Sequence, residues 1–199
     1  MDLLGYGSSS LKGAESSRLG IRSGRLMERT RQDRLPLKLL NRALDAADEQ
    51  RILLLFNRMI ELKNKSRFAA QSGLNRVTLY RGFSPGGSPT LETVLKALDA
   101  FALRFQCSPR TAGQEHLRMT AAPLSDAFAT NDLEVISRAF GETVHAQANI
   151  AEFSRRVSIS RMSLYRWIQA GNALKFRSIL KITSALGLRL EVAWRSSPP

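Results

Sequence analysis

Cysteine and histidine are almost absent from this sequence. Cys107 is the single cysteine, and the 199 residues contain two histidines. One cysteine cannot form an intrachain disulfide, which is typical of a protein from a reducing compartment. A structural zinc site needs about four Cys or His ligands, so the composition excludes one. We therefore expect a cytoplasmic protein without a metal or any other cofactor.

Long apolar runs are absent too. No stretch approaches the roughly 18 consecutive apolar residues of a membrane-spanning helix, so we expect no membrane span. Near the N-terminus, the acidic Asp2 precedes a Gly- and Ser-rich stretch, without the apolar segment of a secretory signal. With 43% hydrophobic and 24% charged residues, the composition is that of an ordinary globular protein.

Acidic residues are scarce relative to basic ones. The chain has 30 Lys and Arg against 17 Asp and Glu, a formal net charge of +13 at pH 7. Such an excess favours a polyanionic partner, nucleic acid first and an anionic membrane surface second. Residues 1–35 carry only +3 of this charge in a Gly- and Ser-rich stretch, which predicts a disordered basic N-terminal tail. Such a tail is either a solvated leader or an arm that touches a phosphate backbone.

The strongest feature of the sequence is an internal repeat. The segment Leu79-Tyr80-Arg81 recurs at an offset of 85 as Leu164-Tyr165-Arg166. At the same offset, residues 68–104 match 153–189 at apolar and turn positions without a gap, and further upstream the offset becomes 84. We interpret the chain as two copies of one helical module. The predicted organisation is a tail over 1–35, a first domain over 36–107, a linker over 108–122, a second domain over 123–195 and a C-terminal tail over 196–199.

The first copy has the pattern of two short helices joined by a tight turn. One helix is predicted over 66–72, Gly73 suits a left-handed turn residue, and Asn75 suits the N-cap of a second helix over 76–83. This is the helix-turn-helix arrangement, whose second helix enters the DNA major groove. Arginine pairs with guanine edges or phosphates, threonine donates or accepts, and valine meets a thymine methyl. The predicted DNA-binding residues of this copy are Lys65, Arg67, Asn75, Arg76, Val77, Thr78, Tyr80 and Arg81.

The second copy repeats this plan with departures at the turn. Ser160 replaces Asn75 as the predicted N-cap, and Ser158 stands in place of Gly73, which is less favourable where φ is positive. For the tyrosine that follows the core leucine in each copy, contact with nucleic acid and packing along the helix edge both stay open. The predicted DNA-binding residues of this copy are Arg155, Arg156, Ser160, Arg161, Met162, Ser163, Tyr165 and Arg166.

Each copy ends in alternating apolar and polar residues, at Leu103–Phe105 and at Leu188–Trp194. The second alternation is long enough to predict a short strand. A lone strand needs a partner, and three stay open: its counterpart in the first copy, a second chain in a homodimer, or another protein. The predicted fold class is therefore all-α, with two tandem helix-turn-helix domains that each end in a short β-strand.

Most of the net charge lies in two matched windows. Residues 57–82 contain six Lys or Arg against one Glu, and residues 152–181 contain seven against one. The two windows together carry +11 of the net +13. Charge concentrated on the two helix-turn-helix units favours a DNA-binding footprint over a generally solvated surface.

A family resemblance rests on four segments of the first copy. These are Gly73-Leu74-Asn75-Arg76, Leu79-Tyr80-Arg81, the Ser-Pro-Gly-Gly-Ser-Pro loop at 84–89, and Leu103-Arg104. The chain resembles the addiction-module antidote family, the HigA-like antitoxins of the lambda-repressor-like helix-turn-helix superfamily. The resemblance is good over residues 40–105, in the first copy, and looser over 124–194, in the second. The resemblance implies a five-helix DNA-binding domain that represses its own operon, often with a RelE-like ribonuclease toxin as partner. Family members usually carry one module, so the duplication is a departure.

We therefore predict a sequence-specific transcriptional regulator of antitoxin type, a repressor that reads double-stranded DNA with two units. The alternative is an interaction protein that neutralises a RelE-like toxin, with DNA binding secondary. We expect no enzyme, because neither His116 nor His145 has a carboxylate or cysteine arranged around it, as a general base would require. The pair Gly86-Gly87 lacks the spacing of a phosphate-binding loop.

Overall fold

The computed structural model describes residues 35–111, 113, 115–170 and 174–195, with backbone only for 166–170. The tail predicted over residues 1–35 lies outside the described residues except for Leu35, and the C-terminal tail at 196–199 lies outside them entirely.

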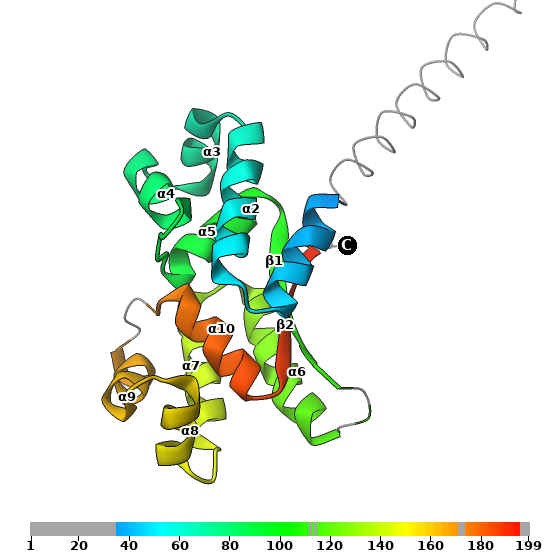
Figure 1. The fold of residues 1–199 in the computed structure, drawn as a ribbon, viewed down its shortest axis with the longest axis vertical. Helices are drawn as coiled ribbons and strands as arrows, with labels where there is room; N and C mark the ends of the chain where they lie inside the picture. Colours follow the sequence, from blue (N-terminus) through cyan, green and yellow to red (C-terminus); the bar gives the residue numbers. More distant parts are fainter. Residues whose placement is uncertain (1–34, 112, 114, 171–173, 196–199) are drawn as a thin grey trace, which may run out of the picture. The chain divides into compact units, whose positions relative to one another are not determined.

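Helices and one small sheet make up the described part of the chain (Figure 1). A helix over residues 35–45 comes first. It is followed by α2 (Glu49–Leu62), α3 (Lys65–Ser72), α4 (Arg76–Phe83), α5 (Leu91–Ala100), β1 (Leu103–Pro109), α6 (Glu115–Thr130), α7 (Leu133–His145), α8 (Ile150–Val157), α9 (Arg161–Ala170), α10 (Phe176–Ala185) and β2 (Leu188–Trp194). The predicted helical character is confirmed, and the strand expected over Leu188–Trp194 is present.

The starting points of these elements recur along the chain. The starts of α3, α4, α5 and β1 recur as those of α8, α9, α10 and β2 at the offset of 85 seen in the sequence, and the start of α2 recurs as that of α7 at 84. The offset therefore changes between the start of α2 and the start of α3, upstream of residue 68, where the sequence matches also change offset. Two residues separate α2 from α3, whereas four separate α7, which is one residue shorter than α2, from α8.

Short polar side chains cap α3 and α4 and their counterparts α8 and α9. The Asn75 side chain accepts a hydrogen bond from the Thr78 N–H at 2.7 Å, and Asn64 caps α3 in the same way. Their counterparts Asn149 and Ser160 accept from N–H groups of α8 and α9. Each cap satisfies an N–H that the helix leaves without a partner and contributes about 1 kcal/mol. The predicted caps Asn75 and Ser160 are confirmed.

Both α3 and α8 end at a residue in the left-handed conformation. Gly73 has φ 65°, and its counterpart Ser158 has φ 52°. Glycine adopts this conformation freely, whereas a residue with a Cβ is strained there by about 1–2 kcal/mol. The expectation that serine is the less favourable residue at this turn therefore applies, because φ is positive.

The segment expected to be a linker is mostly regular structure. Of residues 108–122, the first two belong to β1 and the last eight to α6, which continues through Pro123. A proline inside a helix costs about 3 kcal/mol, because it removes a hydrogen bond and crowds the preceding turn. Here Ala121, Leu124 and Phe128 are buried, and α6 packs against β1. Tertiary packing thus outweighs the tendency of Pro123 to break the helix. Residues 110–114 connect β1 to α6.

The strands β1 and β2 pair with each other in an antiparallel, two-stranded sheet. Gln106 lies opposite Glu191, its equivalent at the offset of 85, and Leu103 lies opposite Trp194 at one end. The register is symmetric about the pair of Gln106 and Glu191. For example, Leu103 pairs with Trp194, and their equivalents at the offset of 85, Leu188 and Pro109, also pair with each other. A two-fold axis through Gln106 and Glu191 produces this pattern. Of the three partners left open for the second strand, the structure contains its counterpart in the first half.

A helix side chain closes the outer edge of each strand. Asn41 accepts from the Val192 N–H at 2.7 Å and donates to the Val192 carbonyl at 3.0 Å. On the other edge, the Ser125 hydroxyl accepts from the Cys107 N–H at 2.7 Å and donates to the Cys107 carbonyl at 2.9 Å. Open peptide groups on a strand edge recruit further strands, so these bonds close both edges at their middle. Asn41 precedes β1 but caps β2, whereas Ser125 precedes β2 but caps β1.

A second contact obeys the same two-fold relation. Thr90 and Lys175, again equivalent at the offset of 85, form an isolated antiparallel bridge at the starts of α5 and α10. The peptide groups on either side of this pair exchange hydrogen bonds of 2.6 and 3.0 Å. Two separate pairs of equivalent residues therefore lie on one axis.

One hydrophobic core joins the two halves. The ring of Phe105 in β1 has its centroid 5.4 Å from that of Phe128 in α6 and 5.8 Å from that of Phe176 in α10. All three rings are buried. None of the described helices is both long enough and apolar enough to cross a membrane.

Candidate nucleic-acid interface

Two short helices, α3 and α4, are joined by a turn of three residues. Gly73 ends α3, Leu74 is buried, and Asn75 starts α4. The inner face of α4 presents Leu79 and Phe83, which are 6% and 0% exposed, toward α2 and α3. This packing leaves the opposite face of α4 open to solvent. α8 and α9 are joined in the same way by Ser158, Ile159 and Ser160.

The open face of α4 carries most of the residues predicted for DNA binding. Arg76 and Arg81 are exposed, and Val77 and Tyr80 are 58% and 53% exposed. Thr78 is half-buried, and its N–H is taken up by the Asn75 cap. The face therefore combines two cations with an apolar and an aromatic side chain on one helix.

Arg76 is oriented by a residue that the sequence analysis did not single out. The Ser66 hydroxyl of α3 accepts a hydrogen bond from Arg76 Nη2 at 2.7 Å. This bond holds the guanidinium at the junction of the N-termini of α3 and α4. The two residues are ten positions apart, a separation that no local sequence pattern marks.

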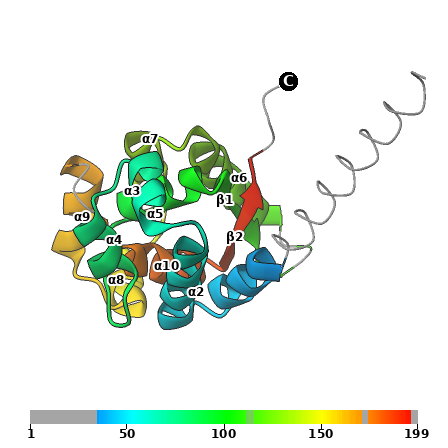
Figure 2. The same ribbon diagram turned by 90° about the horizontal axis from the view of Figure 1, so that it is seen from above.

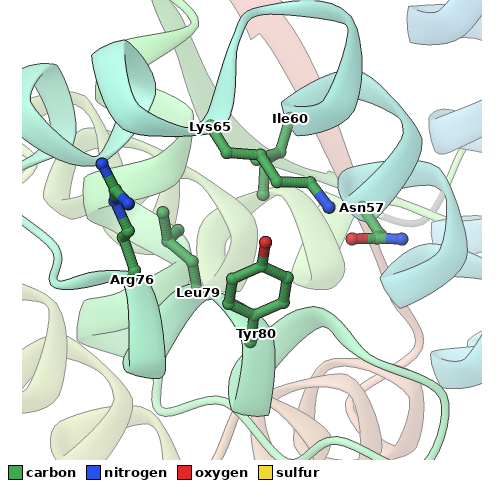
Figure 3. Close-up of a pocket in the computed structure, with 6 residues that line it drawn as sticks. All are labelled: Asn57, Ile60, Lys65, Arg76, Leu79 and Tyr80. Carbon is green, nitrogen blue, oxygen red and sulfur yellow. The ribbon is translucent and has the colours of Figure 1, made fainter.

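Lys65 covers the ring of Tyr80. Its Nζ lies 4.8 Å from the ring centroid and 3.4 Å from Glu61 Oε1. Figure 3 shows the Lys65 side chain extending across Tyr80 toward Asn57. The hollow beneath these residues has a volume of about 10 Å³, room for about one water molecule and too little for a small-molecule ligand. The structure thus shows the packing role for Tyr80, because one face of its ring lies against Lys65, while half of its surface stays exposed.

α9 presents a similar face. Arg161 is exposed, Met162 and Tyr165 are 68% and 39% exposed, and Ser163 is half-buried beside the Ser160 cap. The Tyr165 ring packs against His145, with centroids 5.6 Å apart. The predicted residue Arg166 lies in α9, but its side chain is outside the described residues.

The two arginines before the second turn make different contacts. Arg155 donates from Nε to the Ala151 carbonyl within α8. Arg156 pairs with Glu152 at 3.7 Å and lines a separate open groove of about 590 Å³ with Arg177 and Lys181. The structure therefore does not bring Arg156 together with Arg161 and Met162.

Five arginines of α3, α4, α8 and α9 have no carboxylate partner among the described residues. Among the described residues, no carboxylate forms a salt bridge with Arg67, Arg76, Arg81, Arg155 or Arg161. Some arginines on other surfaces have such partners, for example Arg118 with Glu115 and Arg138 with Glu134, whereas others, such as Arg42 and Arg51, have none among the described residues. Cations without internal partners are available to an external anion.

A site for metal chemistry is not formed by the described residues. No group of three His, Cys, Asp or Glu side chains among them is placed to hold a metal ion. Cys107 is buried in β1, and desolvation, with a smaller effect of the Glu191 carboxylate, raises the pKa of its thiol to about 12. Its thiol is therefore protonated and unreactive near neutral pH.

Comparison with known proteins identifies the first half of the chain. A family model described as "Probable addiction module antidote protein" matches residues 27–109. A protein of Haemophilus influenzae, described as uncharacterized, is 34% identical over 67 residues, which is 34% of this chain and 69% of that protein. The chain belongs to the addiction module antidote family. No solved structure matches this antidote protein.

The family match covers α2 through β1 of the antidote protein and ends before α6. The matched region therefore contains the whole α3–α4 unit, with Arg76 and Tyr80, and the entire strand β1. The α8–α9 unit lies beyond it.

The two open faces of the antidote protein lie on the same side of the sheet. In Figures 1 and 2, α4 and α9 are both found on the far side of α5 and α10 from β1 and β2. Lys175, which the sequence analysis did not single out, lies at the start of α10, and its Nζ donates to the Ser88 carbonyl at 3.2 Å. It adds an exposed cation at the two-fold contact between the halves.

Proposed function

We propose that this antidote-family protein is a sequence-specific DNA-binding regulator that represses its own operon in the cytoplasm. In this proposal the chain contains two tandem helix-turn-helix domains, and α4 and α9 are their recognition helices. The observation that carries the proposal is the presence of two open helix faces on one side of the sheet, with arginines that have no carboxylate partner among the described residues.

The chemistry of these faces suits the major groove. Arginine binds the two acceptors of guanine in a bidentate manner, and a valine or methionine contacts a thymine methyl. On α4, Arg76 and Val77 are the residues that would read bases, whereas Lys65 and Arg67 on α3 would bind phosphates. Two recognition helices joined in a two-fold arrangement would meet successive major grooves roughly 34 Å apart.

The test compares paired arginine variants on DNA from the region upstream of the gene. Arg76→Ala with Arg161→Ala removes one base-reading cation from each face, which costs about 1–3 kcal/mol per residue. Arg118→Ala with Arg138→Ala is the matched control, because it removes the same charge from side chains that are 63% and 64% exposed elsewhere. We expect the first pair to abolish the preference for the upstream duplex over a scrambled one and the control to keep it. Equal effects of the two pairs would refute the assignment of α4 and α9.

A second function is favoured by the family itself. Antidotes of addiction modules act on a toxin, and we propose that this chain also neutralises one, of the RelE-like ribonuclease type. A small basic reading frame next to the gene, toxic when expressed alone and harmless when expressed with this chain, is the expected result. The absence of any such neighbour would leave the protein as a stand-alone regulator.

A further inference from the structure

The two-fold relation inside this chain has a consequence for the DNA that it binds. We propose that a single chain recognises an asymmetric operator, made of two half-sites that are inverted relative to each other but differ in sequence. This inference rests on the proposed function, because it concerns the same two recognition helices. It goes beyond that function in naming the symmetry of the operator and the number of chains bound to it.

The inverted arrangement follows from the pairs on the two-fold axis. Gln106 pairs with Glu191, and Thr90 pairs with Lys175, and each pair joins equivalent positions of the repeat. α4 begins as far before Thr90 in the chain as α9 begins before Lys175. The same axis therefore relates α4 to α9, so their N-termini enter DNA in opposite senses, as the two subunits of a dimeric repressor do.

The number of chains follows from how the sheet is used. In a homodimer, equivalent strands pair across the axis, but here β1 and β2 of one chain already make that pairing. At the middle of the outer edges, the peptide groups of Val192 and Cys107 are bonded to Asn41 and Ser125. The sheet therefore offers a second chain no free peptide group at these central positions. One chain supplies both recognition helices.

The asymmetry follows from the residues on the two open faces. The first arginine is shared, as Arg76 and Arg161, and so is the tyrosine four positions later. The two positions that follow the arginine differ, with Val77 against Met162 and Thr78 against Ser163. These are the positions that would contact thymine methyls and base edges, so the two half-sites share the base read by arginine and differ beside it.

The hydrogen bonding of the shared arginine also differs between the two faces. Ser66 holds Arg76 by a hydrogen bond of 2.7 Å, whereas the equivalent position before Arg161 is Ala151, which has no hydroxyl. An arginine that is held in place loses less rotamer freedom on binding. The α4 half-site is therefore read more strictly than the α9 half-site.

Selection from a random duplex library tests the inference with the full chain. The library spans roughly 30 base pairs, enough for two half-sites about one helical turn apart. We expect wild type to enrich a sequence with two inverted half-sites that differ in at least one base pair, and mass measurement to give one chain per duplex. The variant Val77→Met with Thr78→Ser gives α4 the face of α9, and it should enrich a symmetric site and bind the wild-type site about tenfold more weakly. Both positions are on the open face, and an unchanged circular dichroism melting curve verifies folding.

Three results would overturn the inference. They are a perfect palindrome enriched by wild type, two chains per duplex, and the same site enriched by wild type and variant. Each of these still requires sequence-specific binding, so the proposed function would survive them. Failure of the proposed function is different: no sequence is enriched at all, and the inference is lost with it.

A second pair of variants separates the two half-sites. Ser66→Ala should weaken discrimination at the α4 half-site by about threefold to tenfold and leave the α9 half-site unchanged. Ala151→Ser is the reciprocal variant and should sharpen discrimination only at the α9 half-site. Equal effects on both half-sites would contradict the assignment.

Discussion

Gln106 lies opposite Glu191 in the sheet, and these two residues occupy equivalent positions in the internal repeat. A residue that pairs with its own equivalent lies on a symmetry axis. The same holds for Thr90 and Lys175, so both contacts describe one two-fold relation inside a single chain. A two-fold axis relates the subunits of a closed dimer in the same way.

The edge caps predict a stability effect. Asn41→Ala and Ser125→Ala each remove both hydrogen bonds from one strand residue, at Val192 or at Cys107. We expect each variant to lower the free energy of unfolding by about 1–3 kcal/mol, because buried peptide groups lose their partners. Urea denaturation measures this. Asn57→Ala is the control, since its one bond, to Glu61 at 3.3 Å, is exposed. A loss at Asn57 as large as at Asn41 would contradict the role of the caps.

The equivalent helix ends predict opposite effects of glycine and alanine. A Cβ at Gly73 would meet no atom within 4 Å, so Gly73→Ala should cost about 1 kcal/mol through its positive φ alone. Ser158→Gly relieves the same strain and should raise thermal stability slightly. Gly87→Ala should be worse than Gly73→Ala, because its Cβ would clash with the Gly82 carbonyl oxygen. The expected melting temperatures therefore fall from Ser158→Gly through Gly73→Ala to Gly87→Ala. Any other order would contradict these roles of the positive φ angles and of the contact at Gly87.

Cys107 predicts a dependence of stability on alkaline pH. Burial raises the pKa of its thiol from 9.0 to about 12, so the unfolded chain loses this proton at lower pH than the folded one. Below pH 9.0 the contribution of the buried thiol to the free energy of unfolding is intact. As pH rises toward 12, that contribution falls by about 1.4 kcal/mol per pH unit. The difference between wild type and Cys107→Ala in unfolding free energy should therefore shrink above pH 9.0. A constant difference from about pH 7 to 11 would show that the thiol is not buried as described.

Lys65 predicts an effect on affinity without an effect on specificity. Its Nζ lies over the Tyr80 ring, beside the open face of α4 and off the row of base-reading residues. Lys65→Ala should weaken binding to the upstream and scrambled duplexes alike and reduce the slope of log affinity against log salt by about one. Titrations at several salt concentrations measure both quantities. A selective loss on the upstream duplex would move Lys65 into the base-reading group.

Local signals in the sequence predicted the parts of the fold that depend on local physics. Asn75 and Ser160 are short polar residues before apolar helical runs, and both cap the helices expected. Pro123 was misleading, because its local signal for a break is outweighed by the packing of α6 on β1. A single-residue signal cannot report how much buried surface surrounds it.

The features of the fold and of the candidate site that escaped prediction depend on contacts between separate elements of the structure. The partner of Asn41 is Val192, 151 residues away, and no periodicity in the sequence connects them. Nothing in the sequence distinguishes Ser66 from other polar residues of a short helix. It contacts Arg76 only because the turn between α3 and α4 brings the two side chains together. Arg156 carries the charge expected of a DNA contact, but its helix directs it to the groove with Arg177. The sequence shows where charged residues lie along the chain, but the packing of the helices determines on which surface of the protein each charge lies.

The affinity ratio of the wild-type chain for two duplexes tests the central claim most directly. One duplex carries the region upstream of the gene and the other a scrambled sequence of the same composition, measured by fluorescence anisotropy at physiological salt. A sequence-specific regulator should bind the upstream duplex about 10³-fold or more tightly. Equal affinities for the two duplexes would contradict the account, because the charge on α4 and α9 would then bind DNA without reading it.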